Sequence, residues 1–255
     1  MSSRTSRTSA ALIAIFAVAT GAIPAQAQTL GADPNSAAPF GQPVDDEHVW
    51  LHGMLDQFEG RFGKSSGLRW DSEAWAGTDT DRLWLKSEGQ LGKHGVVEDG
   101  QQEIYYSRPL SAYFDVQVGA RYDMDARPGR GWAALGVEGT APYFFHVSAT
   151  AFASDKGHFA AKLTGSYDLL LTQQLVLQPE LELNLYSKAD PKRLVGSGFS
   201  DLDMGLRLRY EISRKFAPYV GVVYEKKFGH TASFSTASGD KSDALRFTFG
   251  VRAWL

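Results

Sequence analysis

The chain has 255 residues, no cysteine, 26 glycines and a formal net charge of −3. The absence of cysteine excludes a disulfide scaffold, a thiolate zinc site, an iron–sulfur cluster and a thiol nucleophile. The near-neutral charge, which includes no basic block, argues against nucleic acid as a partner, and the 43% hydrophobic content excludes a disordered chain.

The first 27 residues have the pattern of a signal peptide. Arg4 and Arg7 give a positive start, residues 10–23 are mainly apolar, and Ala25-Gln26-Ala27 offers a small-x-small cleavage site. The apolar stretch is too short for a spanning helix, which needs about 20 residues, so an N-terminal anchor helix is the less favoured interpretation. We therefore predict that residues 1–27 are removed and that the mature protein is exported.

Residues 28–48 differ in composition from the rest of the chain. Pro34, Pro39 and Pro43 interrupt this segment, acidic residues occupy positions 45–47, and neither a helical nor a strand period is present. We predict a flexible, disordered leader in the periplasm, followed by a single domain over residues 49–255.

From about residue 49 onward, apolar and polar residues alternate with the two-residue period of β-strands. In the last segment, Leu245, Phe247 and Phe249 share one face, and the residues between them are polar or glycine. A tilted membrane-crossing strand needs roughly 9 to 11 residues, whereas strands of soluble sandwiches average about five or six. The alternating segments have the longer length, and they lie near residues 50–61, 68–77, 82–91, 100–107, 111–123, 131–140, 143–152, 157–168, 174–187, 200–212, 216–228 and 244–255.

The connections between these segments alternate in length. Every second one is a tight turn, at residues 78–81, 109–110, 141–142, 169–173 and 213–215. The others are longer and polar, including residues 188–199 and 229–243. This asymmetry is typical of outer-membrane barrels, whose short turns face the periplasm, so we predict an all-β fold: a transmembrane antiparallel up-and-down β-barrel of about 12 strands. We place it in the cell outer membrane, in contact with lipid, with the N-terminal leader and the C-terminus facing the periplasm.

Several longer stretches of the chain resemble one family. They include residues 82–89 (RLWLKSEG), 131–136 (GWAALG), 167–173 (YDLLLTQ), 206–212 (LRLRYEI) and 226–229 (KKFG). Through these motifs, which are spread over the whole predicted barrel, the chain resembles the copper resistance protein B family. The resemblance implies an outer-membrane barrel that takes part in bacterial copper resistance and homeostasis and binds or passes copper ions. It further suggests a periplasmic multicopper oxidase as a partner.

One departure from the family pattern concerns the copper ligands. Family members often carry a leader rich in methionine and histidine, whereas the leader of this chain has no such ligand before His48. His48, His52 and Met54 remain nearby and share one face of an extended strand. Because thioethers select Cu(I) and imidazoles suit Cu(II), we predict a low-affinity copper site there, at the periplasmic mouth. The alternative is three unrelated side chains at the start of a strand.

The polar face of the predicted strands carries nearly balanced charge, with acids from Glu59 to Glu225 and bases from Arg61 to Arg252. This balance indicates interlocked salt bridges that fill a narrow lumen. An acidic path that attracts Cu²⁺ is the alternative, because a cleft lined by one charge concentrates counter-ions. His146 and His158 also fall on the polar face of adjacent strands. We expect each to be a hydrogen-bonded lumen histidine, and a copper ligand in the second interpretation.

No catalytic motif accompanies this pattern. The chain contains neither a Gly-x-Ser-x-Gly elbow nor a His-Glu-x-x-His motif nor a phosphate loop. Gly196-Ser197-Gly198 lacks the third glycine of a dinucleotide fingerprint. We therefore do not expect an enzyme. The alternatives to a copper barrel are a general structural or diffusion barrel with no copper specificity and, less favoured, an outer-membrane lipid hydrolase.

Overall fold

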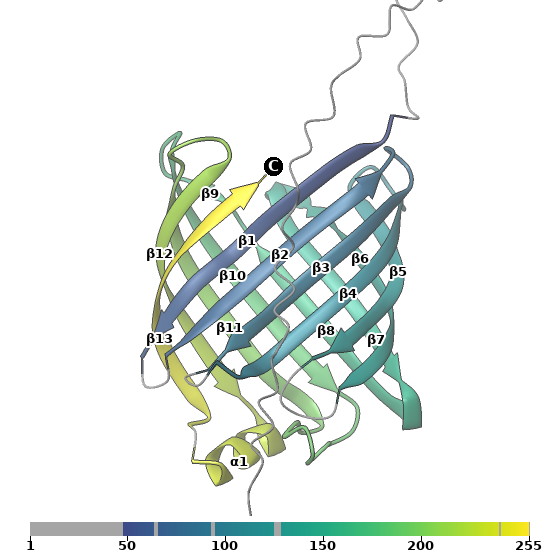
Figure 1. The fold of residues 1–255 in the computed structure, drawn as a ribbon, viewed down its shortest axis with the longest axis vertical. Helices are drawn as coiled ribbons and strands as arrows, with labels where there is room; N and C mark the ends of the chain where they lie inside the picture. Colours follow the sequence, from purple (N-terminus) through teal and green to yellow (C-terminus); the bar gives the residue numbers. More distant parts are fainter. Residues whose placement is uncertain (1–47, 64–65, 93–94, 125–128, 240, 255) are drawn as a thin grey trace, which may run out of the picture. The chain divides into compact units, whose positions relative to one another are not determined.

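The computed structural model describes residues 48–63, 66–92, 95–124, 129–239 and 241–254 (Figure 1). The predicted signal peptide, nearly all of the predicted leader, and Leu255 lie outside these residues. Most of the described chain is β-strand. The long strands are β1 (Trp50–Phe62), β2 (Gly67–Gly77), β3 (Arg82–Leu91), β4 (Val97–Pro109), β5 (Phe114–Asp123), β6 (Arg130–Ala141), β7 (Phe145–Ser154), β8 (His158–Ser166), β10 (Leu175–Tyr186), β11 (Gly198–Tyr210), β12 (Phe216–Lys227) and β13 (Asp243–Trp254).

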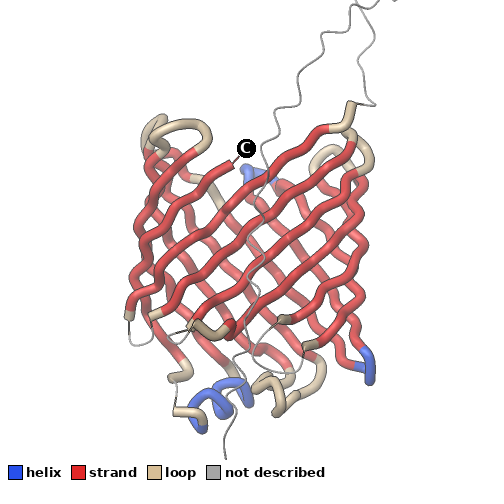
Figure 2. The backbone as a smooth tube through the Cα atoms, viewed as in Figure 1, coloured by secondary structure: helices blue, strands red, loops and turns tan. Residues whose placement is uncertain are grey.

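The long strands form a closed barrel (Figure 2). Each pairs antiparallel with the next long strand along the chain, and β1 also pairs with β13, so the sheet has no free edge. Within the described ranges twelve long strands make up this barrel, and β9 (Leu169–Leu170) is a two-residue strand added to the start of β10. The predicted fold is confirmed. Alternation at this strand length gives every strand one face toward the lumen and one face outward.

The helical segments are short and lie in the connections. They are η1 (Pro142–Phe144), η2 (Asp155–Gly157) and α1 (Gly229–Ala237). No helix in the described part of the chain combines the length and the apolar content that a membrane crossing needs.

The outward face of the barrel is apolar and exposed. Leu83, Val118, Leu135 and Phe247, from four different strands, have between 48% and 65% of their surface accessible. On a water-soluble protein such a continuous apolar surface would drive association. An apolar outer face on long tilted strands is typical of barrels that span a membrane.

A bulge in β1 changes which of its residues face the lumen. The pairing of β1 with both of its neighbours shifts register in the middle of the strand. Strict alternation places Trp50 on the outward face together with Phe58. In the structure Phe58 is exposed on the outside and Glu59 is buried inside, but His52, two residues after Trp50, packs its ring against lumen residue Trp75. The bulge therefore reverses the alternation in the first half of β1, so that the side chains of His52 and Met54 face the lumen.

The two ends of the barrel differ in their connections. The end where β1 begins and β13 stops carries the turns after β2, β4, β6, β8 and β11, and we call it the turn end. The two longest connections, one of which contains α1, lie at the opposite, loop end, together with short ones such as η2 (Figure 1). Three successive turns, after β4, β6 and β8, expose large apolar side chains at Leu110, Tyr113, Tyr143, Phe144 and Leu170. Tyr143 and Phe144 also have positive φ values of 67° and 65°, which are strained for residues other than glycine. The turns on either side, at residues 78–81 and 213–215, are polar.

At the loop end, an ion pair holds the connection between β10 and β11. The carboxylate of Asp190 lies 2.6 Å from the guanidinium of Arg130 at the start of β6. Burial raises the pKa of Asp190, but the hydrogen bond and charge of Arg130, aided by the backbone N–H of Lys192, outweigh burial and lower that pKa below its usual value. The charged form of Asp190 therefore stabilises the folded loop.

We expect this loop to loosen in acid. Because the pKa of Asp190 is lowered by folding, the ion pair stabilises the loop above the unfolded pKa of about 3.9 and is lost as pH falls through the folded pKa. A nitroxide label on Lys192→Cys, in a chain with no other cysteine, should give a broad EPR spectrum at neutral pH and a narrow one in strong acid. With Asp190→Asn added, the label should be mobile both at neutral pH and in strong acid. A spectrum that Asp190→Asn leaves unchanged would contradict this role of the ion pair.

Candidate functional site

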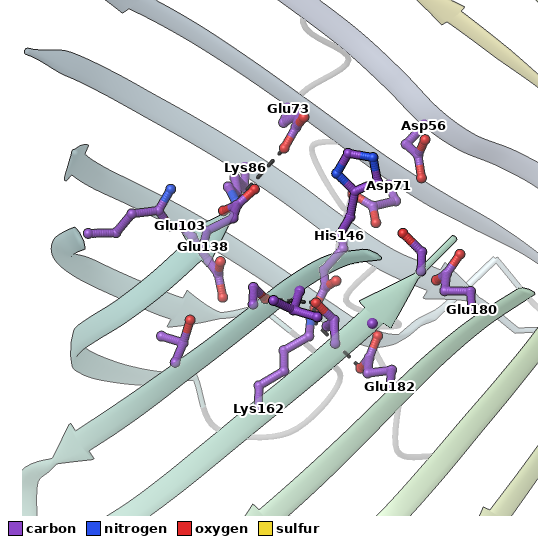
Figure 3. Close-up of a pocket in the computed structure, with 18 of the residues that line it drawn as sticks. Asp56, Asp71, Glu73, Lys86, Glu103, Glu138, His146, Lys162, Glu180 and Glu182 are labelled. Atoms are coloured by element: carbon purple, nitrogen blue, oxygen red, sulfur yellow. Dashed lines mark hydrogen bonds and ion pairs between the residues drawn. The ribbon is translucent and has the colours of Figure 1, made fainter. Parts of the chain in front are cut away.

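The lumen contains a cavity of about 280 Å³ whose walls are rich in acid (Figure 3). Strands β1 to β8 and β10 contribute to it. The only lysines among its lining residues are Lys86 and Lys162. Its acidic lining residues are Asp56, Asp71, Glu73, Glu88, Glu103, Glu138, Glu180 and Glu182.

The two lysines neutralise part of this charge. The Nζ atom of Lys86 lies 2.5 Å from a carboxylate oxygen of Glu138 and 3.9 Å from one of Glu73. Lys162 lies 3.7 Å from Glu182 and also pairs with the carboxylate of Glu88 on β3. The lysines thus bridge carboxylates on different strands and hold the walls of the cavity together.

Three of the other cavity carboxylates, those of Asp56, Glu180 and Glu182, pair with arginines, and two more have no cation partner in the described part of the chain. Asp71 pairs with no cation among the described residues. Glu103 accepts a hydrogen bond from the Tyr105 hydroxyl at 3.1 Å, while its Oε1 atom is buried without a partner in the described structure. Because a cavity with one excess charge raises the local concentration of counter-ions, this one favours cations.

The wall formed by β7 and β8 is polar but uncharged apart from Lys162. The hydroxyl oxygens of Ser148 and Thr164 lie 2.7 Å apart across the two strands. His146, next to the start of β7, is exposed and lines the cavity together with the acids. The structure thus places His146 on the lumen face, in the lining of the same cavity as the carboxylates.

Met54 and His52 lie beside the cavity in the first half of β1. Met54 pairs in register with Glu73, a cavity residue, and its Sδ atom accepts a hydrogen bond from Nη2 of Arg252 at 3.3 Å. The His52 ring lies 5.9 Å from the ring of Trp75. Residues two apart in a strand are separated by about 7 Å, so His52 and Met54 are close enough to approach one ion.

The other two predicted ligands lie apart from the cavity. His48 is four residues from His52, a separation of about 13 Å in an extended chain. His158 begins β8 at the loop end, whereas His146 lies at the turn end of β7. The structure therefore does not bring the five predicted ligands together. In the described chain no three or more His, Cys, Asp or Glu side chains are grouped so as to hold a metal ion.

Beside the cavity, paired charges fill the lumen; we call this set the arginine cluster. Glu59, with 0% of its surface exposed, accepts hydrogen bonds from Arg61 Nε at 2.8 Å and Arg207 Nε at 2.9 Å. Tyr219 donates a further bond to Glu59 at 3.1 Å, and Arg61 reaches Glu225 at 2.8 Å. Interlocked salt bridges and an acid-rich space, the two alternatives for the lumen, thus occur side by side in different parts of it.

Aromatic side chains fill another part of the lumen; we call this set the aromatic cluster. Tyr105, Trp132 and Phe152 are only 2–4% exposed, and Trp84 and Tyr186 pack against them. Sequence reasoning missed this cluster because it treats the lumen face as polar. The signal is nevertheless present, since Trp132 and Phe152 fall on the same alternation as the lumen acids of their neighbourhood.

The comparisons with known proteins agree on one family. The family model described as copper resistance protein B precursor (CopB) matches residues 49–255. The chain is 39% identical over 216 residues to copper resistance protein B of Escherichia coli. It is 41% identical over 216 residues to the copper resistance protein B homolog of Pseudomonas syringae pv. tomato (strain ATCC BAA-871 / DC3000). Each alignment covers 84% of this chain and 73% of the relative.

The fold also has a counterpart among solved structures. The NanC porin superposes with a TM-score of 0.51 at 12% identity, covering 80% of this chain and 99% of that chain. At this identity the likeness shows the barrel fold alone. With a family model that matches the whole barrel and relatives at about 40% identity, the chain belongs to the copper resistance protein B family.

Proposed function

We propose that this barrel binds copper ions, or passes them, through its acidic cavity as part of bacterial copper resistance and homeostasis. The observation that carries the proposal is the excess of carboxylates over lysines in the cavity lining. A cavity of this charge concentrates cations. Membership of the copper resistance protein B family makes copper the cation to test.

The donors available around the cavity favour weak and exchangeable binding. Carboxylates and the imidazole of His146 suit Cu(II), and the thioether of Met54, next to His52, suits Cu(I). The chain has no thiol that could bind copper tightly. We assign His146 to the cavity and His52 with Met54 to its rim, and we keep His48 and His158 as separate, weaker sites. The copper ion is cargo in this scheme, and none of these residues has a catalytic role.

The orientation of the barrel is part of the same proposal. Short turns face the periplasm in bacterial outer-membrane barrels, so the turn end, where β1 begins and β13 stops, would face the periplasm. A signal peptide over residues 1–27 and a leader over residues 28–48 fit export to that side. The apolar outer face would contact outer-membrane lipid, and a periplasmic multicopper oxidase would meet the turn end.

Calorimetric titration of the refolded barrel with Cu²⁺ at about pH 7 tests the proposal. The double variant Asp71→Asn with His146→Ala should weaken binding by about tenfold or more, because it removes an unpaired carboxylate and the cavity imidazole. His230→Ala is the matched control, since His230 is exposed on α1 and does not line the cavity. Equal affinities for the double variant and the wild type would mean that the cavity is not the copper site.

The same titration separates the rim from the cavity. His48→Ala with His52→Ala should remove the rim contribution and leave binding in the cavity. Imidazoles must be neutral to bind metal, so the histidine-dependent part should fade as pH falls through about 6.5. A general diffusion barrel would give no saturable copper binding, and its deletion would leave the copper tolerance of the cell unchanged.

A further inference from the structure

Near the loop end, buried side chains from both sides of the barrel meet in the lumen. Six lumen residues, each within two positions of the loop end of its strand, are 9% exposed or less. They come from β1, β2, β5, β6, β7 and β11. We call them the septum: Arg61, Arg69, Asp123, Trp132, Phe152 and Ser200.

Bonds that cross between strands hold the septum together. Arg69 of β2 reaches Glu182 of β10, nearly opposite in the strand order, at 3.4 Å. Trp132 Nε1 donates a hydrogen bond to Asp123 at 2.8 Å, and Arg193 from the loop after β10 pairs with the same carboxylate at 3.1 Å. Arg69 thus spans the lumen, whereas Asp123, Trp132 and Arg193 are linked to one another on the side of β5 and β6.

Residues of α1 and of a long loop cover the septum from the loop end. The Thr231 hydroxyl of α1 lies 3.1 Å from the hydroxyl of Ser200. The backbone N–H of Gly196 donates to the same Thr231 oxygen at 2.7 Å. Thr231 is itself buried. Above Ser200, an ion that enters from the loop end therefore meets α1 and the long loop before it reaches the septum.

The cavity extends instead to the turn end. Its lining includes Thr140, one residue before the end of β6, and Ser166, the last residue of β8. His146, which also lines it, is exposed. The acidic lining is thus continuous with residues at the turn end and is separated from the loop end by the septum.

We propose that the lumen is blind: the acidic cavity exchanges small ions only through the turn end, and the barrel is a receptacle and not a channel. If copper is its cargo, which rests on the proposed function, copper is taken up and returned on one side of the membrane. The residues of the septum close the lumen in two ways. Arg61 and Arg69 do so through ion pairs, and Trp132 and Phe152 through the packing of their aromatic rings.

Ion conductance of the full chain in planar bilayers tests this proposal. In concentrated KCl the wild type should show no stepwise current, because the septum closes the loop end of the lumen. Trp132→Ala with Phe152→Ala removes two septum side chains and should raise the conductance by about tenfold or more above the wild-type background. Leu135→Ala, on the outward face of β6, is the control and should stay silent. A wild type that conducts as well as the septum variant would overturn the proposal.

A second measurement does not depend on the septum variant folding. The chain has no cysteine, so single cysteines can be placed in proteoliposomes of known orientation. Thr150→Cys in the cavity should react with a membrane-impermeant maleimide only from the turn side, as the turn control Thr80→Cys does. Ala237→Cys on α1 should react only from the loop side. Reaction of Thr150→Cys from both sides would disprove a blind lumen.

These tests are independent of copper. A silent barrel that binds no Cu²⁺ in calorimetry would refute the proposed function and leave the blind lumen standing. A conducting barrel that binds Cu²⁺ in its cavity would refute the blind lumen and leave the proposed function standing.

Discussion

Glu59→Gln should be among the most destabilising single substitutions in this barrel. Glu59 is fully buried and accepts charged hydrogen bonds from Arg61 and Arg207, so the amide would remove the one buried carboxylate that the two guanidinium groups share and leave them only their outer partners, Glu225 and Glu180. Breaking a buried pair of this kind costs about 3–5 kcal/mol. Urea unfolding followed by tryptophan fluorescence, with heat-modifiable migration as the check of the folded barrel, measures the loss.

The matched control changes a carboxylate that is exposed. Asp81→Asn breaks the pair with Arg108 at the turn end, whose side chains are 43% and 60% accessible. Exposed ion pairs contribute about 0–1 kcal/mol. A loss for Glu59→Gln no larger than for Asp81→Asn would show that the arginine cluster does not stabilise the fold.

Gly119→Val should prevent most of the chain from folding. Gly119 faces the lumen on β5, where a Cβ atom would collide with the backbone carbonyl of Ile104 and would stand 2.8 Å from the Tyr105 ring. The ring is fully packed in the aromatic cluster, and the carbonyl belongs to the neighbouring strand, so neither can move without breaking the β4–β5 ladder. The folded fraction after refolding, measured by heat-modifiable migration, should fall to near zero.

Gly131→Val is the control for this substitution. Gly131 lies in β6, and nothing stands within 4 Å of the position where its Cβ would be. It should refold like the wild type. Equal yields for the two valine variants would mean that the close approach at Gly119 is not required for the barrel.

The strands of this fold are predictable because two environments act on every one of them. In a membrane-spanning barrel the outward residues are apolar and the inward residues are mostly polar, so the alternation continues over whole strands. The predicted segment 82–91 coincides with β3, and the predicted segment 244–255 differs by one residue at its start from β13. The short turns and long loops follow from the same pattern.

Local departures from alternation were not predictable in this way. The bulge in β1 adds a residue, and no glycine or proline in the sequence marks it. Strict alternation therefore places Trp50 wrongly on the outward face. The region 229–243 was predicted as a loop, yet residues 229–237 form α1, which packs on the loop connecting β10 and β11 through Thr231 and Gly196. Both features depend on contacts between segments far apart in the chain.

The candidate site was predictable only in part. His146 was placed in the lumen correctly, because the face of a residue follows from its position in its own strand. Which lumen residues meet across the barrel depends on the stagger of all the strands, which a single strand does not reveal. For this reason the separation of the acidic cavity from the arginine cluster could not be read from the sequence. The placement of His146 and His158 at opposite ends of the barrel, in contrast, follows from the antiparallel order of two consecutive strands.

The turn end of the barrel has one further consequence, for the bilayer around it. The three turns that carry Leu110, Tyr143 and Leu170 follow one another around the rim, on the side away from the seam between β1 and β13. Side chains so exposed and so apolar belong below the water boundary, whereas the turns at 78–81 and 213–215 belong above it. The leaflet must therefore reach further along one arc of the rim than along the other, at a cost of a fraction of a kcal/mol per Å. In the proposed outer membrane, this uneven rim would tilt the barrel axis away from the bilayer normal.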